Sequence, residues 1–141
     1  MTLCGSIVEM ALATPELAPL AVGGVWHGMA PRMCAAPYIR INLLYGADTH
    51  NSGTVYYRTS TILVSIFAKT WGEVERLAAI WVETFNHHMA PLNFAEGNHG
   101  TVHCGELRDN GTFDNSLTTT GTKLCHGILM MRVITEHHLS A

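Results

Sequence analysis

The sequence predicts an α+β fold, in which two helices pack on one face of a single, mostly antiparallel sheet of four to five strands. Strand-like segments occur in runs joined by turn residues and do not alternate strictly with helices. One clear 3.6-residue apolar stripe, in residues 70–88, predicts a helix that must cover the sheet. The predicted order is α-β-β-β-α-β-β.

The length of 141 residues predicts one domain, residues 1–141, with a core of its own. Apolar residues make up 48% of the chain and charged residues only 13%. Such a chain has weakly charged surface left over, which favours packing against partners and indicates an oligomer. The net charge is −3 and the basic residues are scattered, which disfavours tight nucleic-acid binding through a charged surface.

The beginning of the chain predicts two short helical units. Ser6 and Glu9 have the S-x-x-E spacing of a capping box, which predicts a helix over residues 7–13. Thr14, followed by Pro15, has the pattern of a second helix start. The segment lacks a basic start and carries Glu9, so it does not fit a signal peptide, and no apolar run approaches the roughly 20 residues of a membrane span. We therefore expect no membrane partner.

Three strands are predicted next. Residues 24–29 predict a short edge strand, and residues 38–45 a half-buried strand with Ile39, Ile41, Leu43 and Tyr45 on one face. The polar residues 46–54 predict a hairpin loop. The return strand, residues 56–68, is rich in β-branched residues, with Ile62, Val64, Ile66 and Ala68 on one face.

The main helix is predicted over residues 70–88. Thr70 and Glu73 repeat the capping-box spacing. The apolar stripe that must face the sheet comprises Val74, Leu77, Ala78, Trp81, Val82 and Phe85.

The last third of the chain predicts two strands. Residues 90–101 are irregular, residues 102–108 predict a strand, and Asp109-Asn110-Gly111 predicts a turn. A Thr-rich segment, residues 118–122, leads into a last strand over residues 124–136, with a loose tail from about His137. In this strand Leu129, Met131 and Val133 face one way, and Ile128, Met130 and Ile134 face the other. Apolar residues on both faces predict helix cover on one face and a neighbouring subunit on the other.

The search for chemistry favours a protein that is not an enzyme and holds no cofactor. Nine histidines invite a metal-site interpretation, above all His99, His103 and Cys104, but neither HExxH nor CxxC spacing occurs. Surface histidines are the favoured interpretation. The four cysteines are widely spaced and outside any nucleophile motif, so free buried thiols are expected. A histidine-based metal-binding module or enzyme stays as the less favoured alternative.

The sequence also resembles a known family. The matching segments lie in order along most of the chain, and residues 91–122 match least. The carrying residues are Thr14-Pro15-Glu16-Leu17-Ala18-Pro19-Leu20, Gly23-Gly24-Val25-Trp26, Ala30-Pro31, Ala36-Pro37-Tyr38, Val64-Ser65-Ile66-Phe67-Ala68, Glu75-Arg76-Leu77-Ala78 and the closing strand from Leu129 to Ile134. The pattern is similar to the tail-terminator (tail-completion) proteins of long-tailed bacteriophages.

The resemblance implies a virion protein at the head–tail junction, assembled in the host cytoplasm. Copies would form a ring, commonly a hexamer, that stops growth of the tail tube and contacts the tail-tube protein and the head-connector protein. DNA would pass through the lumen without specific binding. Another head–tail connector component, such as a neck or stopper protein, remains an alternative.

A closed ring needs two different patches on each subunit, and the sequence offers candidates for both. Trp26 is either a core residue, the interpretation that we favour, or an anchor at a contact. The other candidate contacts lie on the mixed face of the 56–68 strand, on the second face of the last strand, and in or next to the loops at 46–54 and 109–122. The candidate contacts are Trp26, Asp48, His50, Asn51, Tyr57, Thr59, Thr61, Arg108, Asp109, Phe113, Ile128 and Met130.

Overall fold

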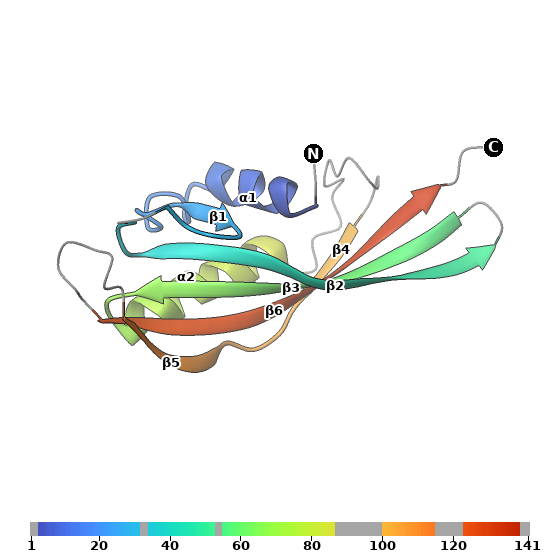
Figure 1. Ribbon diagram of the computed structural model, residues 1–141. Helices are drawn as coiled ribbons and strands as arrows, with labels where there is room; N and C mark the ends of the chain where they lie inside the picture. Colours follow the sequence, from blue (N-terminus) through green and yellow to red (C-terminus); the bar gives the residue numbers. More distant parts are fainter. Residues whose placement is uncertain (1–2, 32–33, 53–54, 87–99, 115–122, 139–141) are drawn as a thin grey trace.

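A computed structural model describes residues 3–31, 34–52, 55–86, 100–114 and 123–138, and the α+β class is confirmed in this part of the chain (Figure 1). The order is α-β-β-β-α-β-β-β, one strand more than predicted, and the sheet has six strands. The elements are α1 (Leu3–Ala13), β1 (Val25–His27), β2 (Tyr38–Ser52), β3 (Val55–Ala68), α2 (Trp71–Phe85), β4 (Gly100–Cys104), β5 (Arg108–Asp114) and β6 (Lys123–His138).

The sheet is mixed but mostly antiparallel, as predicted. Its strand order is β1-β2-β3-β6-β4, and β5 also pairs with β6. Strand β1 is shorter than the predicted 24–29, lies at the edge, and runs parallel to β2. Strands β4 and β5 pair with successive lengths of β6, at residues 131–135 and 123–128. Strand β6 is therefore hydrogen-bonded to three other strands, β3, β4 and β5.

Both helices pack on one face of the sheet and share one core. The predicted stripe of α2 is buried except for Val82, which is half-buried, and the predicted face of β3 is fully buried. Thr70 caps the helix, since its Oγ1 accepts a hydrogen bond of 3.3 Å from the backbone N–H of Glu73. The helix ends at Phe85, where Asn86 caps it, earlier than the predicted residue 88.

Trp81 and Gly127 fix how closely α2 lies on the sheet. Trp81 is fully buried, packs 4.6 Å from the Phe85 ring, and its Nε1 donates to Met131 Sδ at 3.1 Å. A Cβ on Gly127 would lie 2.5 Å from Val74 Cγ1 and 2.9 Å from Leu107 Cδ1. The absence of a side chain at Gly127 lets the helix and Leu107 approach β6 this closely.

The predicted start of the first helix was wrong. Helix α1 begins at Leu3, so Ser6 lies inside it and is buried, and it cannot act as an N-cap. Cys4, Ile7 and Ala11 form the buried face toward the sheet. Thr14 does not begin a second helix: its Oγ1 donates to Met10 O at 2.9 Å at the end of α1, and residues 15–20 form turns.

The predicted hairpin is confirmed, since β2 and β3 pair antiparallel, but the loop bounds of 46–54 were wrong, because β2 continues to Ser52 and β3 begins at Val55. We call residues 46–52, 55–60 and 133–138 the arm; Figure 1 shows this end of the sheet extending beyond both helices. In the arm, β3 is hydrogen-bonded on both sides, and Arg58 Nε lies 2.8 Å from Asp48 Oδ1 across the strands. Pairing on two sides stabilises this part of β3, which extends beyond both helices.

The predicted turn at Asp109-Asn110-Gly111 lies inside β5, where it forms an irregularity in the pairing with β6. Gly111 has a φ of +84°, and its N–H donates to Asp109 Oδ1 at 2.8 Å, so the local turn chemistry is kept. The strand predicted over 102–108 is instead β4, which ends at Cys104. Strand β6 extends to His138, and residues 118–122 lie outside the described residues.

Candidate interaction surface

The face of the sheet opposite the helices carries the main candidate surface. Side chains alternate between the two faces, and Val64, Leu129 and their neighbours point into the core. The residues between them, such as Leu63 and Met130, which are paired across β3 and β6, point to the other face. No helix of the described residues covers this second face, which we call the open face.

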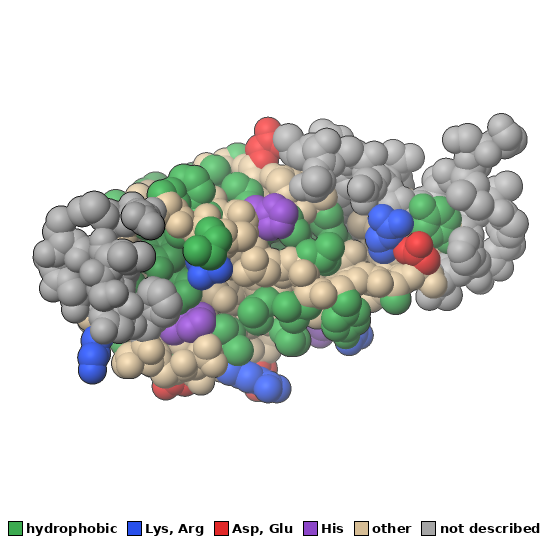
Figure 2. Space-filling view, in the orientation of Figure 1, with side chains coloured by type: hydrophobic (Ala, Val, Ile, Leu, Met, Phe, Trp, Pro, Cys, Tyr) green, Lys and Arg blue, Asp and Glu red, His purple; other side chains and the backbone are tan. Residues whose placement is uncertain are grey.

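Large apolar side chains recur along the open face. Tyr45 is 63% exposed, Met130 50% and Ile134 39%, while Leu63 and Ile128 are half-buried. These five residues, the apolar strip, come from β2, β3 and β6, which are neighbours in the sheet. Figure 2 shows hydrophobic side chains gathered along the lower middle of that view. Several large apolar side chains exposed on one face of a sheet indicate a protein contact.

A hollow of about 250 Å³ lies at the edge of the apolar strip, between the end of β4 and the start of β5. Its wall includes Arg108, Ile128 and Met130, so the structure brings three of the predicted contact residues together, and Glu106 lines it as well. Arg108 pairs with Ile128 across β5 and β6, which places the guanidinium on the open face. The backbone N–H of Gly105 donates to Met130 O at 2.8 Å and closes the gap between the strands.

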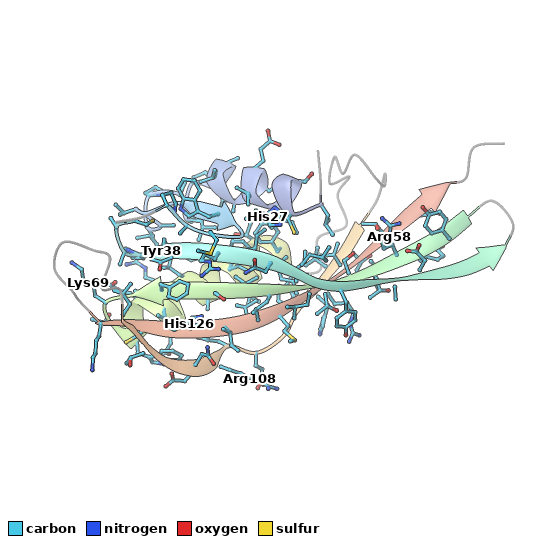
Figure 3. The ribbon with its side chains drawn as sticks, in the orientation of Figure 1. His27, Tyr38, Arg58, Lys69, Arg108 and His126 are labelled. Atoms are coloured by element: carbon cyan, nitrogen blue, oxygen red, sulfur yellow. The ribbon has the colours of Figure 1, made fainter. Side chains whose placement is uncertain are left out.

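A stack of three rings fills one end of the open face. Tyr38, Phe67 and His126 are directly paired across β2, β3 and β6, with ring centroids 4.7 Å and 4.3 Å apart (Figure 3). Phe67 is buried within the single chain by this stack. Phe67 therefore leaves almost no side-chain surface exposed for a neighbouring subunit.

Burial disfavours charge in this stack. Burial lowers the pKa of His126, and the nearby Arg40 guanidinium lowers it further. His126 Nδ1 lies 3.1 Å from Asn110 Nδ2, an amide donor, while Nε2 is buried without a hydrogen-bond partner among the described residues. Burial also raises the pKa of Tyr38. The stack holds a neutral histidine.

The remaining predicted contacts are spread over the sheet. Tyr57, Thr59 and Thr61 lie on the open face of β3, but Thr61 is buried. Trp26 is 37% exposed and paired with Arg40 on the open-face side of β1, so its core interpretation was wrong; its Nε1 donates to Gly23 O at 2.7 Å.

Two further predicted contacts lie away from the apolar strip, and the side chains of three more are not described. Asp48 pairs with Arg58 on the opposite face of the arm, and Asp109 holds the irregularity in β5. His50, Asn51 and Phe113 belong to strands, but their side chains lie outside the described residues.

The sequence placed Tyr45 on the wrong face. It was expected on the same face as Ile41 and Leu43. An irregularity between Leu43 and Tyr45 adds one residue to β2 and reverses the alternation, so Tyr45 pairs with Thr61 on the open face. No sequence signal marks this bulge. Ile134 was assigned to the correct face of the last strand, but was not among the predicted contacts.

The cysteines are free thiols in the structure. Cys4 and Cys104 are buried, and burial raises the pKa of both, that of Cys104 to about 11. Within the described ranges, no three His, Cys, Asp or Glu side chains are grouped so that they could hold a metal ion; His87, His88 and His99 lie outside those ranges. Neither described helix combines the length and apolar character that a bilayer span requires.

The described residues thus define an α+β fold with two helices on one face of a mixed sheet and an apolar strip on the other. No protein-family profile matches the sequence, and no curated protein matches it. Among solved structures, the fold is similar to that of a chain in the virion of a native gene transfer agent particle, with a TM-score of 0.60 and 12% identity. The likeness covers 95% of each chain and, at this identity, shows a shared fold.

Proposed function

We propose that this chain is a structural virion protein of a long-tailed, phage-like particle and acts as its tail terminator. In this proposal, copies form a closed, hexameric ring that caps the tail tube and joins it to the head connector. DNA passes through the ring without specific binding. The shared fold with a chain from a gene transfer agent virion supports the virion class.

The apolar strip is the observation that carries the proposal. Tyr45, Met130 and Ile134 leave substantial apolar surface in water, although the chain has a complete core on the other face of the sheet. Covering the exposed halves of Met130 and Ile134 would contribute about 1 kcal/mol each. Assembly therefore explains a surface that folding of one chain leaves open.

The first test is the mass of the purified chain by light scattering. We expect several times the 15.4 kDa of one chain, and loss of assembly in the Met130→Asp, Ile134→Asp double variant. Val22→Asp is the matched control, because Val22 is 68% exposed but lies in the turn region after α1. A wild-type chain that stays monomeric at every concentration and is absent from purified particles would refute the proposal.

A second test separates a terminator from another connector component. Deleting the gene in a particle-producing strain should give tails of uncontrolled length that are not joined to heads. Electron microscopy of the particles measures both properties. Tails of normal length would instead favour the alternative, a neck or stopper component.

A further inference from the structure

A second apolar depression lies on the helix side of the molecule, along the outer flank of α2. It has a volume of about 740 Å³ and runs between α2 and the connection from β4 to β5. Ala79, Val82 and Leu107 contribute to its apolar floor, and Glu75, Glu83 and Glu106 contribute to its wall. We call this feature the acidic groove.

Besides the three glutamates, the lining of the acidic groove includes two further titratable side chains, His103 and Cys104. None of its three glutamates forms an ion pair with a described residue, and no Lys or Arg lines the groove. The last turn of α2 has no basic residue either, so the negative end of the helix dipole makes the potential in the groove more negative. An apolar floor beside unpaired carboxylates fits an apolar surface that carries cations.

The open face has this chemistry. Arg132 lies between Met130 and Ile134 on the same face of β6, and Arg108 lies opposite Ile128. Both arginines are exposed and form no ion pair with the described residues. The cations are therefore interspersed with the apolar strip.

We propose that the acidic groove of one subunit receives the arginine-bearing apolar strip of the next copy of this chain. The inference rests on the proposed function, because a closed ring of identical subunits requires two different, mutually complementary patches. The apolar strip is one patch and the acidic groove is the other. Each subunit then uses both, one toward each neighbour.

Charge reversal tests this pairing. One variant carries Arg108→Glu and Arg132→Glu, and the other carries Glu75→Lys and Glu83→Lys; all four positions are exposed. Each variant alone should raise the dissociation constant for assembly at least about tenfold, because like charges then face each other. An equimolar mixture should recover assembly, because the new glutamates on the apolar strip of one variant can then face the new lysines in the acidic groove of the other.

Light scattering of the two variants, their mixture and wild type measures the outcome, with thermal unfolding as a check of folding. The matched control carries Glu9→Lys and Glu16→Lys, the same change in net charge at exposed positions on and after α1. The inference is overturned, and the proposed function left standing, if the variant with Glu75→Lys and Glu83→Lys assembles like wild type. The same holds if both variants fold but their mixture does not recover assembly. A monomeric wild type overturns both.

Discussion

Gly127→Ala should destabilise the protein through a single added methyl group. The new Cβ would lie 2.5 Å from Val74 Cγ1 and 2.9 Å from Leu107 Cδ1. Val74 is fully buried, and its β-branched side chain has few allowed rotamers, so it cannot rotate away from the added methyl group. Overpacking of this kind costs about 1–3 kcal/mol. Replacing glycine also lowers the conformational entropy of the unfolded chain, which offsets about 0.4–1 kcal/mol of this loss of stability. The net loss should be about 1–2 kcal/mol.

A double-mutant cycle with Val74→Ala isolates the contact. Val74→Ala alone removes two buried methyl groups and should cost about 2 kcal/mol. In the double variant the alanine at position 127 fills part of the space left at position 74. The combined loss should therefore fall about 1–2 kcal/mol short of the sum of the single losses.

Urea unfolding, followed below the concentration of assembly, gives the free energies of all four species. Gly72→Ala is the control, because a Cβ there meets no atom within 4 Å and the residue lies in α2. It should leave stability unchanged or raise it by up to about 1 kcal/mol. A Gly127→Ala protein as stable as wild type, or strictly additive losses, would contradict the close approach described here.

Three further predictions concern buried groups. The pKa of His126 is lowered below 6.5 in the fold, so the unfolded chain binds more protons as the pH falls below about 6.5, and stability should fall as the pH drops toward the folded pKa. Urea midpoints measured between about pH 5 and 8 should show this decrease, and His126→Gln should make it smaller. Cys104, with a pKa of about 11, should resist iodoacetamide at about pH 8 while half-buried Cys125 is modified, as peptide mass spectrometry would show; equal labelling argues against this burial. Trp81→Phe should cost about 1–2 kcal/mol and Trp81→Ala about 3–5 kcal/mol in urea unfolding, because Trp81 is fully buried; losses below about 1 kcal/mol for alanine would contradict its place in the core.

Elements with a strong local pattern could be predicted from the sequence. The stripe from Val74 to Phe85 has the helical period, and the Thr70 cap marks its start, so local and tertiary preferences agree. The buried face of β3 was predicted for the same reason: residues 62, 64, 66 and 68 alternate and are β-branched or small.

The arm could not be predicted because its stability comes from neighbouring strands. Residues 46–52 are polar and include Asp48, so their composition is that of a loop. Their strand conformation depends on pairing with β3, which is itself held by β6, far away in the sequence. The same holds for Asn110-Gly111, whose turn conformation is kept while β6 orders the chain on both sides.

The candidate surface was predicted in part. The two-faced pattern of the last strand placed Ile128 and Met130 opposite the core correctly. The cover of Phe67 by Tyr38 and His126 depends on which residues face one another across three strands. Strand register is a tertiary property, and neither the ring stack nor the bulge before Tyr45 leaves a local signal.

The position of β6 has a consequence for biosynthesis. Strands β4 and β5 are hydrogen-bonded to β6 alone among the described strands, and β6 follows both of them in the chain. While the ribosome is still translating residues 123–138, the hairpin of β2 and β3 and helix α2 have already been made, but the nascent sheet lacks its central template. The described sheet can therefore close only after residues 123–138 have left the ribosome.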